Sequence, residues 1–581
     1  MRAKFLIGTA TAVFALALAP HAGFAAATMD DVMKRLDAME KRDAEIEKNN
    51  ARLAKENAEL RERMKHIGRK EVVIREVAPV AGQRNAAAQP MPQAGGLPYG
   101  GAAAPSLPGV GIAPLAGGAP LTGATAIQSE IRGLPVAGAP SLYINGVSIT
   151  PGGFIELTGL YRSHFIGADI GTPFQNIPFG NVRSGYANEF RFTARQSRPS
   201  LLVKGDVNPT THISGFLDLD FEGAAQTANL NESNSFTPRI RNLYAAIDQD
   251  DFGAHLLAGQ TWSLATMNSQ GIMPRQENIP LQIDAQYVPG FVWTRNPQIR
   301  VVKDFDQTLW FALSAENPAT TFGGFTTAGT TPATLPDSLV NTVVPVGGSL
   351  FNSGNAISLN HVPDIIGKVA WDPSFEDRHI HMEAFGLMRD FYSQVNGQNQ
   401  DVFGGGVGGS ILVPIIPKTL EFQFSGLTGR GIGRYGAGQL SDVTFNWNGT
   451  IAPLKETMLL TGLVYHASPE LDIYGYAGQE DEQASFSDTT TGRTVNAFGY
   501  GNPLFSNAGC TTPGSTVCNG NVHLIRQLTA GFWDKIYQGP FGSFRTGLQY
   551  SFTEKYGFNG IGGAPKATEN IVMGSLRFYP F

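Results

Sequence analysis

The residues best suited to chemistry in this chain are arginines and carboxylates that alternate with apolar side chains. They are Arg191, Arg195, Asp218, Asp220, Glu222, Arg239 and Arg241. Alternate side chains of an extended strand share one face, so the pattern predicts that these charges point away from the apolar face. Guanidinium groups stay ionised and can hold carboxylates in bidentate geometry. The set therefore predicts charge selection and weak, reversible binding of small ions.

Two arrangements of these charges are open from the sequence. Asp218, Asp220 and Glu222 lie between the two arginine segments along the chain. The charges could therefore pair across neighbouring strands and form a neutralised wall. Alternatively, the arginines form a cluster that draws anions in. Charge separated across a narrow zone would also orient zwitterions, so the arrangements differ in the solutes they favour.

The register of the segment with Arg239 and Arg241 follows from its apolar residues. Ile240 and Tyr244 stand an even number of positions apart, so both are predicted to face the apolar side. Asn242 lies between them on the same side and interrupts the pattern.

The segments that carry these charges belong to a long series of predicted strands over residues 149–581. No run of about 18 apolar residues predicts a spanning helix. From Gly153 onward, apolar residues recur at every second position, and short turns alternate with long connections. Strands placed between these connections number about 16, and such a pattern is typical of outer-membrane barrels. The sequence predicts an all-β transmembrane barrel of antiparallel strands, with both ends on the short-turn side and an aqueous lumen.

The long connections of this barrel are predicted to lie on its outer side. They fall near 166–188, 223–237, 264–290, 316–363, 392–402, 427–456, 480–522 and 554–568. In barrels of this size one long loop often folds inward and narrows the lumen, and loops also commonly stay on the surface. The candidates for a constriction loop are 316–363 and 264–290, and the latter carries Arg275, Glu277, Asp284 and Tyr287.

Three regions are predicted to precede the barrel. Residues 1–27 have the basic start, short apolar run and small residues of a signal peptide, and the run is short for a membrane anchor. Residues 28–68 show a heptad repeat with Asn50 and Asn57 at one core position, which favours an α-helical coiled coil over a lone surface helix. Residues 69–148 are rich in Ala, Pro and Gly and predict an extended linker.

Cysteines and histidines supply the remaining candidate chemistry. Cys510 and Cys518 lie in a loop and, after export, are expected to form a disulfide; a metal site is the alternative, but no histidine cluster lies near them. His379, His381 and Glu383 alternate as metal ligands could. A lumen-facing strand produces the same spacing, so no metal and no cofactor are assigned.

Four segments resemble the DcaP-type outer-membrane porins. They are 195–198 (Arg-Gln-Ser-Arg), 256–263 (Leu-Leu-Ala-Gly-Gln-Thr-Trp-Ser), 291–295 (Phe-Val-Trp-Thr-Arg) and the ending 576–581. The resemblance covers 149–581, and the coiled coil agrees with it. It implies a trimeric barrel for passive uptake of small solutes, often organic anions such as dicarboxylates. Arg295, at the end of the third segment, is assigned to the pore lining with the other arginines.

Together these features predict a porin, and not an enzyme, in the outer membrane of a Gram-negative bacterium. Small hydrophilic solutes would diffuse through a homotrimer whose N-terminal region lies in the periplasm. The expected partners are outer-membrane lipid and lipopolysaccharide, with peptidoglycan a candidate for the N-terminal region. A net charge of −6 disfavours nucleic acid. The alternative is a structural or adhesive anchor whose barrel displays surface loops.

Overall fold

The computed structural model describes residues 55, 132, 134–135, 140–223, 237–324, 360–375, 378–492 and 494–580. The chain divides into two compact units, 1–103 and 104–581, and all described residues except Lys55 belong to the second. The predicted signal peptide lies outside the described residues, as does the predicted coiled coil apart from Lys55. No helix among the described residues is both long and apolar enough to cross a membrane.

A single antiparallel sheet closes on itself to form a barrel. Consecutive strands pair in chain order, and the ring closes where β2 (Val147–Arg162) pairs with β24 (Lys566–Tyr579). Both β3 (Glu189–Thr193) and β4 (Arg198–Asn208) pair with β2, so they share one position in the ring. Over the described residues the barrel has 16 strands. The predicted barrel is therefore confirmed.

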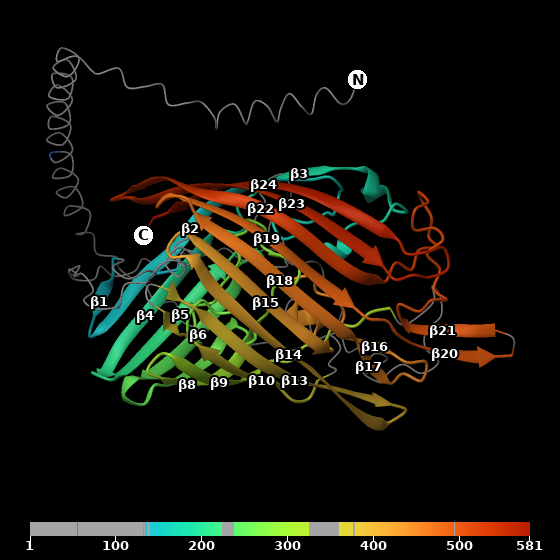
Figure 1. Ribbon diagram of the computed structural model, residues 1–581, viewed down its shortest axis with the longest axis horizontal. Helices are drawn as coiled ribbons and strands as arrows, with labels where there is room; N and C mark the ends of the chain where they lie inside the picture. Colours follow the sequence, from blue (N-terminus) through green and yellow to red (C-terminus); the bar gives the residue numbers. More distant parts are fainter. Residues whose placement is uncertain are drawn as a thin grey trace, which may run out of the picture. The chain divides into compact units, whose positions relative to one another are not determined.

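The remaining strands follow the chain around the ring (Figure 1). They are β5 (Thr211–Asp220), β6 (Arg239–Gln249), β7 (Ala254–Trp262), β8 (Arg295–Phe305), β9 (Leu309–Glu316), β10 (Asp364–Trp371), β13 (His381–Val395), β14 (Gln398–Ile416), β15 (Leu420–Arg430), β18 (Lys455–His466), β19 (Leu471–Glu482), β22 (Val522–Gly539) and β23 (Gly542–Gly557). β1 (Leu142–Ile144) pairs with the start of β2.

Short elements lie in the connections. Three two-stranded sheets are β11 (Ser374–Phe375) with β12 (Arg378–His379), β16 (Val443–Phe445) with β17 (Ile451–Pro453), and β20 (Ser485–Thr491) with β21 (Thr494–Tyr500). The 3₁₀ turns are η1 (Phe174–Asn176), η2 (Arg183–Tyr186), η3 (Asp250–Phe252) and η4 (Gly433–Tyr435).

Alternation of side chains gives the barrel two unlike faces. Outward residues such as Ile155, Leu313 and Leu528 are between 58% and 64% exposed. Inward residues of the same ring include Glu156 and Arg162, which are buried. So much exposed apolar surface around a closed ring is typical of a lipid-facing wall, and would be unfavourable in water.

The connection between β13 and β14 differs from the prediction. A long loop was predicted over 392–402, whereas the two strands continue to Val395 and from Gln398 and are joined by Asn396 and Gly397 alone. Both turn residues have positive φ, 53° and 73°. Asn-Gly adopts this conformation readily and matches the twist of the two strands, so a tight hairpin forms here.

A disulfide joins Cys510 and Cys518 in the connection between β21 and β22. Cys518 packs partly buried against a cluster that includes Phe174, Ile177 and Phe179 from the connection after β2. The bond therefore lies where two long connections meet.

We expect no free thiol in the protein purified without reductant and titrated after denaturation. Closing so short a loop stabilises it locally by about 2–3 kcal/mol in the chain-entropy model. Reduction should therefore loosen this connection and leave the thermal unfolding of the barrel in detergent almost unchanged. The Cys510→Ser/Cys518→Ser variant is the control that gives the background signal of the thiol titration. Two titratable thiols in the wild type would contradict the expectation.

Candidate functional site

The connection between β7 and β8, residues 263–294, folds into the barrel and crosses its lumen. The Leu281 amide donates to the hydroxyl of Tyr476 on β19 (3.1 Å), and the Ile283 amide donates to Gln549 Oε1 on β23 (2.6 Å). Trp533 Nε1 on β22 donates to the Leu281 carbonyl (2.7 Å). These strands stand opposite β7 and β8 in the order of the ring. The predicted loop with Arg275, Glu277 and Asp284 thus lies inside.

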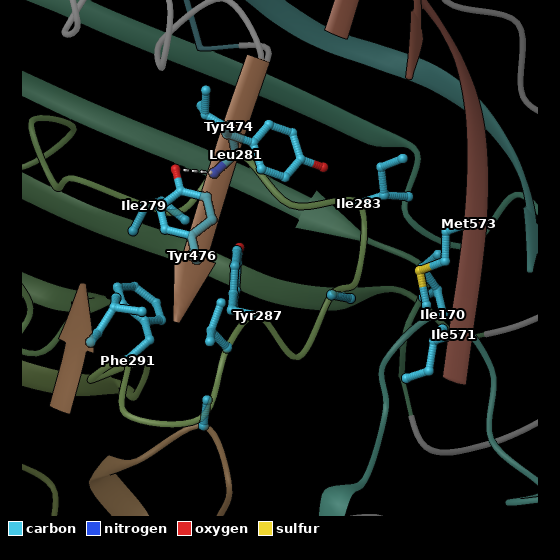
Figure 2. Packing of buried hydrophobic residues seen from close by; sticks show 14 of the residues in the cluster. Ile170, Ile279, Leu281, Ile283, Tyr287, Phe291, Tyr474, Tyr476, Ile571 and Met573 are labelled. Atoms are coloured by element: carbon cyan, nitrogen blue, oxygen red, sulfur yellow. Dashed lines mark hydrogen bonds between the residues drawn. The ribbon is translucent and has the colours of Figure 1, made fainter. Parts of the chain in front are cut away.

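Apolar side chains hold this loop against the far wall. Ile279, Leu281 and Phe291 of the loop lie beside Tyr474 and Tyr476 of β19 in one buried cluster (Figure 2). Each buried side chain of this size contributes roughly 1.5–3 kcal/mol. Because ordering the backbone of a long loop is unfavourable, such contacts are needed to keep it in one conformation inside the lumen.

Asp284 anchors the same loop to the connection that follows β2. Its carboxylate accepts hydrogen bonds from the Thr172 amide (3.1 Å), the Thr172 hydroxyl (2.5 Å) and the Gln286 amide (2.9 Å). Burial raises the pKa of Asp284 from its ordinary value, against the opposing effects of Arg162 and Thr172. Asp284 therefore acts in positioning the loop.

A described part of the predicted linker also contacts the inside of the barrel. Arg132 donates from Nη1 to the Glu277 carbonyl (3.1 Å) and from Nη2 to Glu277 Oε2 (3.0 Å). Leu134 packs with inward side chains of β4 to β7, namely Leu202, Phe216, Tyr244, Ala246 and Leu257. This segment and the constriction loop are therefore joined by an ion pair within the lumen.

Asp220 is the centre of an ion-pair network on the inner wall. It accepts hydrogen bonds from Arg239 Nε (3.0 Å) and Nη2 (2.6 Å), and from Arg241 Nη1 (2.8 Å). Arg239 also lies 3.1 Å from Glu222, and Arg241 lies 3.5 Å from Asp218. Burial raises the pKa of Glu222 despite Arg239. For Arg239 and Arg241, the arrangement is that of a paired wall.

Arg191 and Arg195 pair outside this network. Arg191 lies 3.4 Å from Glu189 on the same strand. Arg195 falls in the break between β3 and β4, where it lies 3.4 Å from Asp169 and donates to the carbonyls of Phe221 and Gly223. Arg195 therefore joins two connections at the rim instead of extending a row of arginines along a strand.

A β-bulge in β6 changes which residues face inward. Asp218 of β5 pairs with Asn242, whereas the next residue, Leu219, pairs with Ile240. Arg241 is therefore the extra residue, and the inward face passes from Arg241 to Asn242. Tyr244 consequently lies buried inside the barrel, so the prediction that it faces outward is wrong.

Arg198 and Arg295 have unfilled hydrogen-bonding capacity. Arg198 lies over the ring of Phe154 (5.4 Å) and Arg295 over the ring of Trp262 (5.0 Å). Within the described parts of the chain, Arg198 Nε and Arg295 Nη1 are buried with no hydrogen-bond partner. A buried donor without a partner is unfavourable, so an anion or water is the natural occupant beside these groups.

These guanidinium groups converge on Tyr287 of the constriction loop. Arg241 Nη2 donates to the Tyr287 hydroxyl (3.3 Å). Burial opposes ionisation of this phenol, yet Arg241, and after it Arg198 and Arg295, lower the pKa of Tyr287 to about 8. Positive charge therefore exceeds negative charge where the loop meets the wall of β4, β6 and β8.

Carboxylates collect on the opposite wall. Glu456 on β18 and Glu480 and Glu482 on β19 are all buried, and neither carboxyl oxygen of Glu456 has a hydrogen-bond partner among the described residues. Glu480 Oε1 accepts from the amides of Gly290 (2.6 Å) and Gly438 (2.8 Å). Between Tyr287 and Gly290 the loop passes from the arginine wall to this wall of carboxyl groups.

The three predicted metal candidates on β12 and β13 are not assembled as a site. His381 contacts Asp372 with Nδ1 (2.6 Å) and Glu383 with Nε2 (3.1 Å), while Lys368 Nζ lies 3.0 Å from Glu383. His379 lies apart and contacts Ser374. Ion pairs within the wall account for these side chains.

The barrel is similar to solved outer-membrane channels. The outer membrane channel DcaP of Acinetobacter baumannii is 17% identical, with 75% of this chain and 99% of that chain covered and a TM-score of 0.50. OprB of Pseudomonas putida is 9% identical, with 74% and 94% covered and a TM-score of 0.42. An anion-selective porin from Comamonas acidovorans is 9% identical, with 74% and 99% covered and a TM-score of 0.38.

These likenesses concern the fold. No protein-family model matches the chain, and no curated protein sequence matches it. At 17% identity, the match to DcaP shows that the two chains share a barrel fold, and the resemblance inferred from the sequence is confirmed at that level.

We expect Leu281→Ala to loosen the constriction loop and raise the mean single-channel conductance and its fluctuations in planar bilayers. The substitution removes a buried side chain that packs on β19 and should weaken the packing by roughly 2–5 kcal/mol. Leu528→Ala is the control, since Leu528 is outward and 62% exposed. If both variants conduct as the wild type does, the loop does not control the width of the channel.

Proposed function

We propose that this chain forms a water-filled channel in the outer membrane of a Gram-negative bacterium, through which small hydrophilic solutes diffuse passively. The observation that carries the proposal is a closed barrel with an apolar outer face, charged side chains inside and a loop folded across its lumen. A pore selects by width and by the field of its lining, and both are present in this arrangement. No catalytic step is part of the proposal.

The solutes favoured by this lining are small organic anions such as dicarboxylates. Arg239 and Arg241 are held by Asp220, and removing both would leave this buried carboxylate without a cation, which costs about 3–5 kcal/mol. They therefore serve mainly as the wall. Arg198 and Arg295 keep unfilled donors beside Tyr287, and these are the groups that an anion would meet.

The wall of carboxyl groups adds orientation to this preference. A solute that carries both a carboxylate and hydrogen-bonding groups would turn its carboxylate to Arg198 and Arg295 and its other polar groups to the carboxyl groups of Glu456 and Glu482. In a hydrated lumen each contact is weak, as release of the solute requires.

The assembly proposed for this channel is a homotrimer embedded in outer-membrane lipid and lipopolysaccharide. The barrels would pack through outward apolar side chains, and the N-terminal region would lie in the periplasm with peptidoglycan as a candidate partner. Both ends of the described barrel, β1 and β24, lie on the side of the short turns (Figure 1). That placement supports a periplasmic N-terminal region.

We expect Arg198→Gln/Arg295→Gln to lower the anion-to-cation permeability ratio measured from reversal potentials in bilayers. A unit charge at 4 Å in water is worth about 1 kcal/mol, so the ratio should fall by up to roughly fivefold for each charge lost. Arg526→Gln/Lys566→Gln is the matched control, because it removes two positive charges that are exposed and paired with Glu554.

The outcomes separate the possible functions. A falling ratio in the lumen variant and an unchanged ratio in the control support anion uptake. An unchanged ratio in both leaves a channel without this selectivity. A wild-type protein that inserts in bilayers and passes no current is an anchor, and the channel proposal would be wrong.

We expect anion selectivity to fall as pH rises from about 7 to 9. The guanidinium groups lower the pKa of Tyr287 to about 8. Above that pH the phenolate adds a negative charge beside Arg241, Arg198 and Arg295, which opposes the entry of anions. Tyr287→Phe should remove the pH dependence in this range, and the exposed Tyr550→Phe should retain it. An equal fall in the Tyr287→Phe channel would assign the titration to another group.

A further inference from the structure

Three metal-ligand side chains from distant segments meet on the outer surface of the barrel. His361 precedes β10, Asp390 lies on β13 and Asp401 lies on β14. One ligand atom of each lies within 4.8 Å of the others. Asp390 pairs with Phe403 and Tyr392 pairs with Asp401 across the hairpin, so both carboxylates share one face.

That face points away from the lumen, at the rim formed by the long connections. Phe403, which shares it, is 72% exposed. The last residue pair of the β10–β13 ladder joins Ile365 and Met388, so Asp390 lies just beyond the end of β10. There Asn360 Nδ2 donates to the Asp390 carbonyl (3.1 Å) and places His361 over the carboxylates.

The contacts of His361 differ from those of other histidines beside two carboxylates. His381 uses Nδ1 for Asp372 and Nε2 for Glu383. His255 likewise assigns one ring nitrogen to each of its two carboxylates. Each nitrogen then has one acceptor in line with it, as a hydrogen bond requires.

At His361, by contrast, a single nitrogen faces both carboxylates. Nε2 lies 3.2 Å from Asp390 Oδ2 and 3.4 Å from Asp401 Oδ1. An N–H shared between two acceptors forms a weaker, bifurcated hydrogen bond than one aimed at a single acceptor. Asp390 Oδ2 is buried and has no hydrogen-bond partner among the described residues.

These separations fit ligands around a cation. A tetrahedral Zn²⁺ with bonds of about 2.0–2.1 Å holds its ligand atoms roughly 3.3 Å apart. The separations at Nε2, 3.2 and 3.4 Å, are of that size. An imidazole suits zinc and similar transition metals better than Ca²⁺ or Mg²⁺, and two carboxylates balance the charge of a divalent ion.

We propose that His361, Asp390 and Asp401 form a binding site for a divalent transition-metal ion, Zn²⁺ being the best fit. The ring of Tyr392 lies 4.3 Å from that of His361 and fixes the imidazole over the hairpin. The side chain of His361 is 42% exposed, so an ion can reach the site from the medium. A bound ion would join the residue before β10 to the β13–β14 hairpin, independently of any conduction through the lumen.

The test is a zinc titration of the full-length protein in detergent, purified without a polyhistidine tag and stripped with EDTA. Isothermal titration calorimetry should show one Zn²⁺ equivalent per chain that is lost in His361→Ala and in Asp401→Asn. The affinity of this equivalent should fall by roughly 100-fold or more, since even partners of ligands contribute 10- to 100-fold. His379→Ala is the matched control, because His379 is exposed and lies outside the site.

Each outcome decides the matter. Loss in both site variants with retention in the control supports the site. Equal zinc binding by His361→Ala and the wild type, or no binding by the wild type, overturns it and leaves an ion pair. A Ca²⁺ response equal to that of Zn²⁺ and insensitive to His361→Ala also overturns it. Resistance to heat dissociation on gels confirms that each variant is folded.

Discussion

Closure of the ring between β2 and β24 is the constraint on which the rest of the structure depends. A strand edge left open in lipid would expose amide and carbonyl groups that no water could satisfy. Pairing of Ile155 with Phe578 and of the residues that follow removes that edge. Once the ring is closed, each strand side chain faces either outward or into the lumen. The apolar belt and the charged interior are two consequences of this one pairing.

The constriction loop must likewise satisfy its backbone hydrogen-bonding groups inside the lumen. The backbone of this loop is not part of the strand pairing of the barrel, so its amide groups need hydrogen-bond acceptors on the barrel wall. Tyr476 and Gln549 provide these acceptors. Apolar contacts with β19 then fix its position (Figure 2). Because the loop is fixed, Tyr287 meets the arginine wall and Gly290 meets Glu480. The contrast between the arginine wall and the wall of carboxyl groups thus depends on the packing of uncharged residues.

The sequence predicts the features of this fold that repeat. Alternation and turn spacing predict the barrel and its strand number, because they recur along the chain. A feature that interrupts the alternation only once is not predicted in this way. The bulge at Arg241, for example, reverses the predicted side of Tyr244. The Asn396-Gly397 turn was overlooked although its signal is local. Contacts between distant segments, such as His361 with Asp390, carry no spacing signal, because loop packing brings them together.

The charged residues divide into those paired with each other in the wall and those whose guanidinium groups lie on aromatic rings. Asp220 pairs with both arginines of β6, and closely paired charges contribute little external field because they cancel locally. Arg198 and Arg295 lie against aromatic rings instead, which attract a cation without neutralising it. Placing a cation on a ring keeps its charge available to the lumen. Under the proposed function, selectivity would therefore depend less on how many arginines face inward than on which partners their guanidinium groups have.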